Sequence, residues 1–468
     1  MVFNSAAFLF MFLPVSFVLY RLVPGVRGKN VLLALLSLVF YAFGGLGQLP
    51  ALLGCALWTW GFGRILARDG AHRKAAAAAG IAGVLALLGF YKYTGFLLSQ
   101  AGLGAAVPKT VLPLGISFFT FHAVSYLADV YRDRTAAERR FGDLFLYLAF
   151  FPRLLAGPIL SWQDARGELT ARDASPEDVS AGLRRFVRGM AKKLILAESA
   201  AAAADAVFAL SAAELSTALA WLGAVSYCLQ IYFDFSGYSD MAIGLGRLFG
   251  FHFCENFDHP YAARTLRDFW RRWHMSLNRW FTRYLYIPLG GSRKGTAVTV
   301  RNTMIVFFFT GLWHGAGWTF ILWGVWHGLL VSAERLWTGT AEKLERSAAG
   351  RGLLHLYTLL AVLLGFVVFR AGSVQQAAAF LGRMFCPAAS LPAAVLLRSL
   401  LTPARIVLGA LGAALCLPIA PAARERFRSL AGEDAAELTG DILALAGLVI
   451  CVFAMAGGSF SPFIYQQF

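Results

Sequence analysis

Two histidines lie in stretches of the chain where ionisable side chains are unexpected. His314 lies in the apolar run 304–326, and His274 lies upstream in a segment rich in tryptophan and arginine. An ionisable group at membrane depth is costly, so it usually lines a cavity that serves a function. Histidine also gives and takes protons near neutral pH. The pair therefore indicates acid–base chemistry, with one histidine moving a proton and the other orienting a substrate.

The residues around His314 favour a site over simple packing. Gly311, Gly315 and Gly317 are small enough for a backbone or a substrate to approach closely. Trp313 and Trp318 could wall a slot. The alternative is a packing histidine that is hydrogen-bonded to a neighbouring helix. Packing or other structural roles are expected for the other histidines, His72, His122, His252, His259, His327 and His355.

A carboxylate in a second apolar run adds to the candidate site. Asp234 lies within 230–240, and a carboxylate inside a span is expensive unless it is paired. It could form a salt bridge or a helix cap, or it could line the same cavity as His314. No GxSxG motif supports a serine nucleophile. Neither an HExxH motif nor a CxxC spacing occurs, so no metal site and no disulfide framework are expected.

The composition predicts an all-α polytopic membrane protein. Of the 468 residues, 58% are hydrophobic and 15% charged, whereas a soluble protein carries about 25% charged residues. We expect about ten to twelve transmembrane or re-entrant helices in one domain over residues 1–468. The first apolar run is expected to stay as a helix, because it lacks the pattern of a cleaved signal peptide. The candidate spans are 6–24, 31–48, 50–66, 76–98, 111–130, 143–161, 193–211, 216–235, 303–322, 320–338, 353–370, 404–421 and 438–456.

Basic loops predict an orientation in the membrane. Alternation of basic and neutral connections places the N-terminus outside and the loops at 27–29, 64–74 and 132–140 in the cytoplasm. The apolar segment 145–162 has basic flanks on both sides and contains Pro152, Gly157 and Pro158. Prolines interrupt helices, so we expect a re-entrant segment buried in protein.

The segment 254–294 alternates cations with aromatic rings and is the most polar part of the chain. This pattern is typical of a helix that lies in the membrane interface. The net charge of +16 follows from basic cytoplasmic loops, and a basic surface would also attract an anionic lipid, nucleotide or coenzyme. Nucleic-acid binding is not expected, because the charge is spread over many loops.

Four motifs together resemble the membrane-bound O-acyltransferases (MBOAT). They are YFDFSGYSD at 232–240, FWRRWHMSL at 269–277, YIPLGG at 286–291 and GLWHG at 311–315. Within that family they are most similar to the branch of alginate O-acetyltransferase membrane proteins. The segments 2–5, 113–122, 157–159 and 192–193 fit the same branch, so the resemblance covers residues 2 to about 330.

The resemblance implies a fold, a reaction and a site. Helices would surround a central tunnel in the bacterial inner membrane, through which an acetyl group from a cytoplasmic acyl-CoA thioester, acetyl-CoA, reaches an extracytoplasmic polysaccharide such as alginate. The family's invariant histidine falls on His314, which would take the proton from the attacking hydroxyl. Its second active-site position falls on His274, which would hold the donor or polarise the developing oxyanion. Substrate-binding side chains are expected at Asp234, Trp273, Arg271, Asn278 and Trp313.

The same resemblance implies partners and leaves alternatives. The cations of 264–294 would bind the phosphates of the coenzyme, no cofactor would be bound permanently, and a separate periplasmic acetyltransferase would act as partner. Other acceptors are cellulose, peptidoglycan, teichoic acid and lipid. A proton-coupled transporter or flippase and an interaction scaffold are the alternatives from other classes, although matching halves with interrupted helices, typical of transporters, are not evident.

Overall fold

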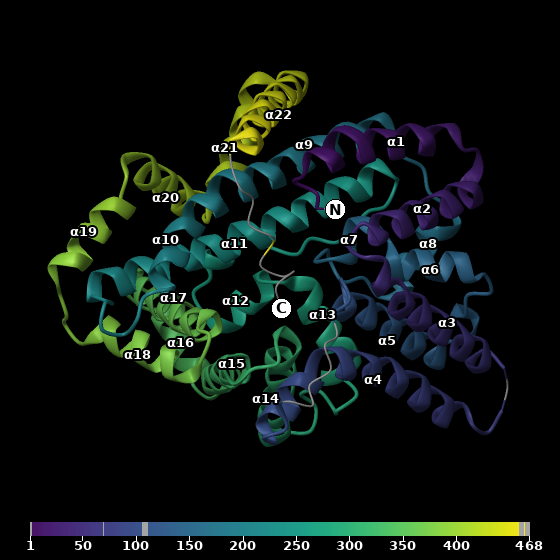
Figure 1. Ribbon diagram of the computed structural model, residues 1–468, viewed down its shortest axis with the longest axis horizontal. Coiled ribbons are helices and arrows are strands. Elements are labelled where there is room, and N and C mark those ends of the chain that lie inside the picture. Colours follow the sequence, from purple (N-terminus) through teal and green to yellow (C-terminus); the bar gives the residue numbers. More distant parts are fainter. Residues whose placement is uncertain (1, 69, 105–110, 458–462, 464–468) are drawn as a thin grey trace. The chain divides into compact units, whose positions relative to one another are not determined.

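The described part of the chain is helical. The computed structural model describes residues 2–68, 70–104, 111–457 and 463, and this part contains helices and no strand (Figure 1). Within it, six helices are long and apolar enough to cross a membrane, or seven if the bent pair α19 (Leu391–Leu400) and α20 (Pro403–Leu415) is one span. The prediction of an all-α polytopic membrane protein is therefore confirmed, whereas the number of ten to twelve inserted helices stays a prediction.

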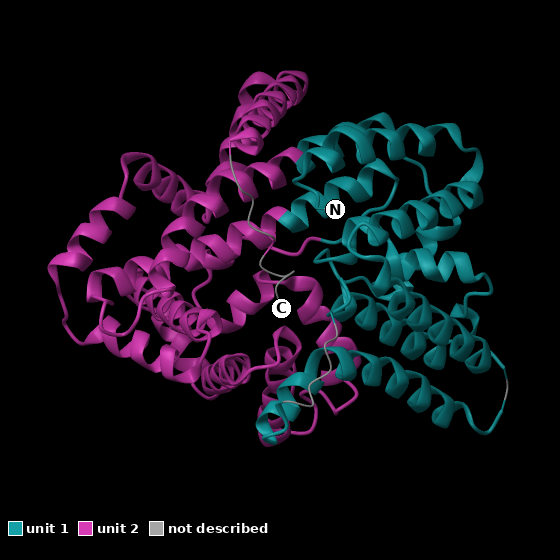
Figure 2. Ribbon diagram, viewed as in Figure 1, with its two compact units in different colours: residues 1–186, 238–254, 465–468 teal, residues 187–237, 255–464 magenta. Residues whose placement is uncertain are grey.

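The chain divides into two compact units (Figure 2). Unit 1 comprises residues 1–186, 238–254 and 465–468, and unit 2 comprises 187–237 and 255–464. The single domain and the central tunnel expected from the sequence stay predictions.

Unit 1 holds the N-terminal helices. In it α3, α4 and α5 pack on one another, and α2 packs on α6. The helices are α1 (Leu13–Leu22), α2 (Gly25–Ala42), α3 (Leu49–Leu66), α4 (Arg73–Gln100), α5 (Ile116–Arg132), α6 (Phe141–Ala149), α7 (Phe151–Leu154), α8 (Trp162–Thr170) and the start of α9 (Pro176–Ala191).

The apolar segment 145–162 is interrupted as expected. Its helix α6 ends at Ala149, the short α7 covers Phe151–Leu154, and 155–161 is irregular before α8 begins. All residues from 144 to 162 are buried, which is where non-helical backbone is tolerated in a membrane protein. The predicted break of the helix is confirmed, and re-entry into the membrane stays a prediction.

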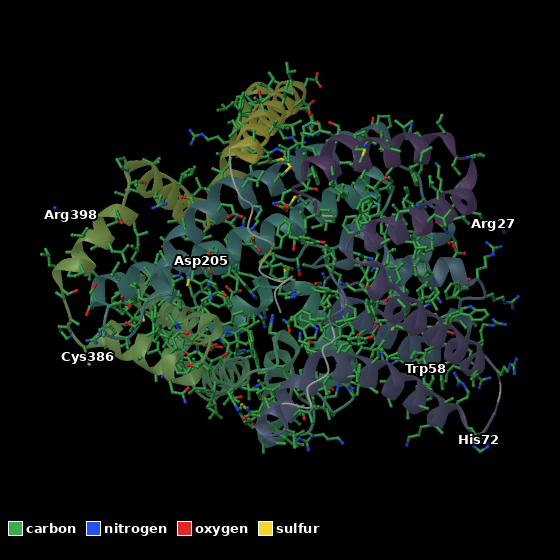
Figure 3. The ribbon with its side chains drawn as sticks, viewed as in Figure 1. Arg27, Trp58, His72, Asp205, Cys386 and Arg398 are labelled. Atoms are coloured by element: carbon green, nitrogen blue, oxygen red, sulfur yellow. The ribbon has the colours of Figure 1, made fainter. Side chains whose placement is uncertain are left out.

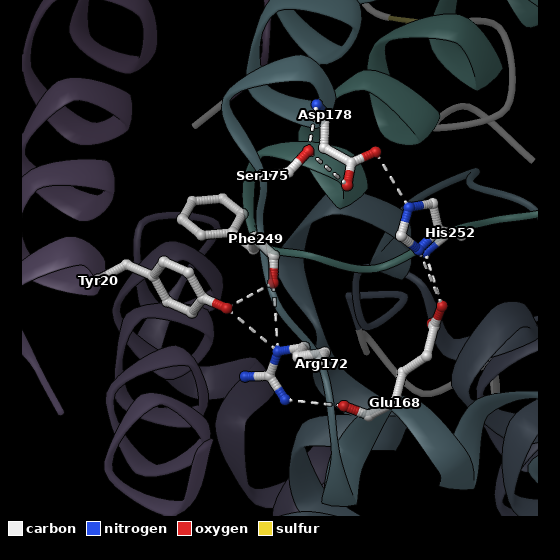
Figure 4. Close-up of polar contacts among 7 residues, drawn as sticks. All are labelled: Tyr20, Glu168, Arg172, Ser175, Asp178, Phe249 and His252. Atoms are coloured by element: carbon white, nitrogen blue, oxygen red, sulfur yellow. Dashed lines mark hydrogen bonds and ion pairs between the residues drawn. The ribbon is translucent and has the colours of Figure 1, made fainter. Parts of the chain in front are cut away.

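A polar network joins distant parts of unit 1 (Figure 4). The hydroxyl of Tyr20 donates to the carbonyl of Phe249 over 2.7 Å, and Arg172 Nε donates to the same carbonyl over 3.2 Å. His252 lies between two carboxylates, with Nδ1 3.2 Å from Glu168 and Nε2 3.1 Å from Asp178. These contacts connect α1, α8 and α9 with the loop after α11, so His252 has the structural role expected of it.

The basic loops carry exposed side chains. Arg27 and His72 are exposed and lie at the edge of the ribbon in Figure 3. His72 lies in the loop between α3 and α4, whereas Arg27 belongs to the first turn of α2, so the loop expected at 27–29 is helical. Exposed cations between apolar helices are typical of a membrane protein's aqueous rim. The side of the membrane on which they lie stays a prediction.

Unit 2 holds both candidate histidines. Its main packing is between α14 and α15, with α17 against α15 and α12 against both α15 and α17. The helices are the end of α9, α10 (Glu198–Phe208), most of α11 (Thr217–Leu248), α12 (Leu266–Arg272), α13 (Met275–Phe281), α14 (Thr296–His314), α15 (Trp318–Leu336), α16 (Thr338–Glu345), α17 (Ala348–Arg370), α18 (Val374–Phe385), α19, α20, α21 (Ile419–Ala431) and α22 (Glu433–Ala456).

Glycines allow α14 and α15 to approach closely. A Cβ on Gly311 would lie 2.3 Å from the carbonyl oxygen of Phe320, and one on Gly324 would lie 2.3 Å from the carbonyl oxygen of Phe307. Both obstacles are backbone atoms, which cannot rotate away. The small residues next to His314 therefore serve the close contact between helices that the sequence indicated.

We expect Gly311→Ala to destabilise the protein by about 1–3 kcal/mol, the usual range for overpacking a tight contact. Gly382→Ala in α18 is the matched control, because a Cβ there meets nothing within 4 Å, and removing an open helical glycine stabilises by about 0.5–1 kcal/mol. The measurement is the free energy of unfolding in mixed micelles. Equal effects of the two substitutions would refute the close contact.

Candidate active site

His314 is the last residue of α14, at the turn of the α14–α15 hairpin. Gly315 and Gly317 are extended, with φ −168° and −165°, and α15 begins at Trp318. This break separates the two spans whose predicted ranges, 303–322 and 320–338, overlapped. His314 therefore lies at a helix end, and its side chain is buried, with 3% of the residue exposed.

Aromatic rings surround the His314 imidazole. The ring centroids of Trp313, Trp323 and Phe369 lie 4.8, 5.1 and 5.1 Å from it. These rings come from α14, α15 and α17, so three helices form the wall around one imidazole. Trp323 and Phe369 were not identified from the sequence, because nothing in their spacing relates them to His314. A neutral imidazole suits such apolar surroundings better than a charged one.

His274 lies at a break between two short helices. α12 ends at Arg272 and α13 begins at Met275, and His274 between them has the left-handed backbone conformation, φ 46° and ψ 52°. A side chain other than glycine rarely adopts this conformation, which persists where the surroundings enforce it and often marks functional sites. The interfacial helix predicted over 254–294 is therefore wrong, since it is broken at His274 and its tryptophans Trp270 and Trp273 are buried.

The imidazole of His274 is buried and held by neighbouring side chains. Its Nδ1 lies 3.2 Å from Oδ1 of Asn256, and the ring packs edge-on against Phe235 at 4.6 Å. His274 lies outside the helices that qualify as spans, and burial lowers the pKa of its imidazole to about 3. The side chain is therefore neutral near pH 7 and able to accept a hydrogen bond.

One tryptophan links the two histidines. The ring of Trp313 lies 6.0 Å from that of His274 and 4.8 Å from that of His314, measured between centroids. Both histidines and Trp313 belong to unit 2. The structure thus brings together the two residues predicted to be catalytic and one of those predicted to bind substrate.

Glu334 of α15 positions the helix that precedes His274. Its carboxylate accepts from the backbone N–H of Leu266 over 2.6 Å and from that of Arg267 over 3.0 Å. These groups belong to the first turn of α12, whose N–H groups have no partner within the helix. An acidic side chain is also favourable at this end of a helix. Glu334 was not identified from the sequence, because the two partners are far apart in the chain.

Asp234 forms a buried ion pair. Its Oδ1 lies 2.6 Å from Nζ of Lys193, and the same ammonium lies 2.8 Å from Glu198. Asp234 is 1% exposed and Lys193 is 2% exposed. This is the salt bridge that the sequence offered as one alternative, and substrate binding by Asp234 stays a prediction.

The other residues expected to bind substrate have different surroundings. Trp273 is 2% exposed and stacks on Phe269 with centroids 5.5 Å apart. Asn278 donates from Nδ2 to the carbonyl of Trp270 over 3.0 Å, which ties α13 to the end of α12. Arg271 is exposed. Contacts within the fold thus account for Trp273 and Asn278. Substrate binding by all three residues stays a prediction.

Cations lie exposed along the same segment. No group of three or more His, Cys, Asp or Glu within the described residues could hold a metal ion. The exposed cations are Arg264, Arg271, Arg279, Arg293 and Lys294.

Three further histidines, His122, His327 and His355, contact structural groups. His122 accepts from Arg153 over 3.1 Å, and His355 donates to the carbonyl of Ala263 over 3.0 Å. His327 is fully buried, and its ring lies 5.2 Å from those of Trp270 and Trp323, measured between centroids. Each of the three is thus accounted for by packing within its own unit.

These features define a class of protein, a helical membrane protein with two buried histidines that both lie near one tryptophan. Residues 110–351 match the family model of the membrane-bound O-acyltransferases. The chain is also 42% identical over 396 residues to a probable alginate O-acetylase of Pseudomonas putida, which covers 82% of this chain and 80% of the relative. The chain belongs to the membrane-bound O-acyltransferase family.

More distant relatives act on different polymers according to their names. A peptidoglycan O-acetyltransferase of Helicobacter pylori is 35% identical over 415 residues, covering 81% of this chain and 78% of its own. A teichoic acid D-alanyltransferase of Streptococcus thermophilus is 28% identical over 289 residues, which cover 55% of this chain and 68% of the relative. The chain is thus an O-acyltransferase, which sets the transporter and scaffold alternatives aside.

Proposed function

We propose that this chain moves an acetyl group from cytoplasmic acetyl-CoA across the bacterial inner membrane for O-acetylation of an extracytoplasmic polysaccharide, with alginate as the first choice. The names of the relatives support a polysaccharide acceptor, and identity is higher to the alginate enzyme than to the peptidoglycan enzyme, 42% against 35%. A separate periplasmic acetyltransferase would complete the delivery to the polymer.

The observation that carries the proposal is the burial of His314 and His274 around Trp313. In the proposed step an acceptor hydroxyl attacks the thioester. The hydroxyl oxygen forms a bond to the acetyl carbon while the neutral His314 accepts the hydroxyl proton. The carbon–sulfur bond of the thioester then breaks, and the proton passes from His314 to the departing thiolate. A positioned base of this kind contributes about 10²–10⁴ to a rate.

The exposed cations supply a place for the donor's phosphates. Arg271, Arg279 and Arg293 are exposed, and guanidinium groups bind phosphate oxygens through paired N–H donors. They flank the sequence that carries His274, so a coenzyme bound by them would bring its thioester toward the buried histidines. Binding the phosphates would be a second role for these cations, in addition to the role of basic loops in setting the protein's orientation in the membrane.

The test is the ester content of the polymer in an alginate-producing bacterium that lacks its own membrane O-acetylase. We expect expression of this chain, together with the host's periplasmic acetyltransferase, to restore alkali-labile acetyl esters on alginate. The peptidoglycan of the same cells, isolated and assayed in parallel, should stay at background. Esters on peptidoglycan and none on alginate would overturn the choice of acceptor.

A further inference from the structure

Asn256 holds the turn at His274 through both its main chain and its side chain. It is fully buried in the loop before α12. Its carbonyl oxygen accepts from the backbone N–H of Met275 over 2.9 Å. Its Oδ1 accepts from the backbone N–H of Ser276 over 3.2 Å and from the Ser276 hydroxyl over 2.8 Å. One residue thus binds the chain on the C-terminal side of the left-handed His274.

These contacts determine which end of the Asn256 amide faces His274. A backbone N–H can only donate, so the side-chain atom that faces the N–H of Ser276 must be the oxygen. The same oxygen lies 3.2 Å from Nδ1 of His274. An oxygen acceptor at that position requires the proton on Nδ1, because two acceptors would repel each other. The lone pair of the neutral imidazole is therefore on Nε2.

We propose that Asn256 is a positioning residue of the acyl-transfer site, which fixes His274 with its proton on Nδ1 and its lone pair on Nε2. The proposal rests on the proposed function, in which the thioester of the donor is brought toward the two buried histidines. With this tautomer Nε2 accepts a hydrogen bond from an N–H or O–H group of a substrate. A neutral His274 cannot donate from Nε2 to an oxyanion, so the oxyanion role expected from the sequence is replaced by substrate orientation.

The rings beside His274 restrict the imidazole further. The ring of Phe235 packs edge-on against it at 87°, and the ring of Trp313 lies 6.0 Å from it, tilted at 58°. Rotation of the imidazole would break the Asn256 contact and disturb both ring contacts. Removing Asn256 would therefore leave the ring in place but free to exchange tautomers, and only part of the population would carry the lone pair on Nε2.

The test compares Asn256→Leu, Asn256→Asp and Asn256→Leu in a His274→Gln background. The assay contains the purified protein, the periplasmic acetyltransferase of an alginate-producing bacterium, [¹⁴C]acetyl-CoA and an alginate oligosaccharide. We expect Asn256→Leu to lower kcat about 10–100-fold, as losses of orienting partners do, with the KM for the donor unchanged. Asn256→Asp keeps the oxygen acceptor and should restore most of kcat. In the His274→Gln background Asn256→Leu should not lower kcat further, because Asn256 acts only by positioning His274.

Asn302→Leu is the matched control, since Asn302 is also fully buried in unit 2 and donates to the carbonyl of Gly291 over 2.9 Å. It should lower the yield of folded protein and leave kcat per folded molecule unchanged. A wild-type kcat in Asn256→Leu, or an equal loss with and without His274, would overturn the inference. Loss of transfer in His314→Ala alongside silent Asn256 variants would refute only this inference, whereas full transfer in His314→Ala would refute the proposed function.

Discussion

Replacing His314 by alanine should lower the rate of acyl transfer about 10²–10⁴-fold, the usual contribution of a positioned acid–base group. The imidazole is buried at the end of α14 among three aromatic rings, and alanine offers no group that can take a proton there. The measurement is the alkali-labile acetyl content of the polymer, normalised to the amount of folded chain in the membrane.

His327→Gln is the control for losing a buried histidine. His327 lies on α15 in the same unit and is as deeply buried as His314, but its ring contacts are packing contacts. We expect the variant to retain transfer in proportion to its folded amount. If His314→Ala transfers acetyl as well as His327→Gln does, then His314 is a packing residue and the base must be sought elsewhere.

Breaking the buried pair between Lys193 and Asp234 should cost about 3–5 kcal/mol of stability, because removing one partner leaves the other charge buried without compensation. Lys193→Met leaves the carboxylate of Asp234, which is 1% exposed, without its 2.6 Å partner. The measurement is the free energy of unfolding in mixed micelles. The double variant Lys193→Met/Asp234→Leu should recover most of the loss, since apolar residues can replace a buried pair.

An exposed ion pair provides the comparison. Arg370 lies 2.7 Å from Asp205, and their side chains are 36% and 50% exposed; Figure 3 labels Asp205. Arg370→Met should cost no more than about 1 kcal/mol, as is usual for surface pairs. If the double variant at Lys193 and Asp234 folds stably but transfers no acetyl group, the carboxylate also serves the substrate. If Lys193→Met alone is as stable as the wild type, the ion pair does not stabilise the fold.

The sequence predicted the helical membrane fold and the pair of histidines, because both depend on local features. Apolar length indicates a membrane helix, and an imidazole at membrane depth stands out from its neighbours. The glycines beside His314 predicted the close approach of a backbone or a substrate, and at Gly311 it is the backbone of α15 that approaches. The alternation of cations and aromatics in 254–294 misled, since it is equally compatible with a broken, partly buried segment.

Contacts between distant residues could not be predicted. Asn256, 18 residues earlier, binds the backbone that follows the left-handed His274, and this contact cannot be read from the local sequence. The first turn of α12 is bound by Glu334 from another helix, and Asp234 finds its cation in the segment before α10. Each contact exists only once the chain has folded, and a single sequence carries no signal of it.

The central claim is that His314 performs proton transfer and does not merely support donor binding. The direct measurement combines donor affinity and single-turnover acetyl transfer in one preparation of purified His314→Ala in lipid nanodiscs, with a non-transferable acetyl-CoA analogue as the binding probe. We predict an affinity equal to that of the wild type together with loss of the transfer step. Transfer at the wild-type rate, or a loss of transfer explained entirely by weaker binding, would contradict the claim.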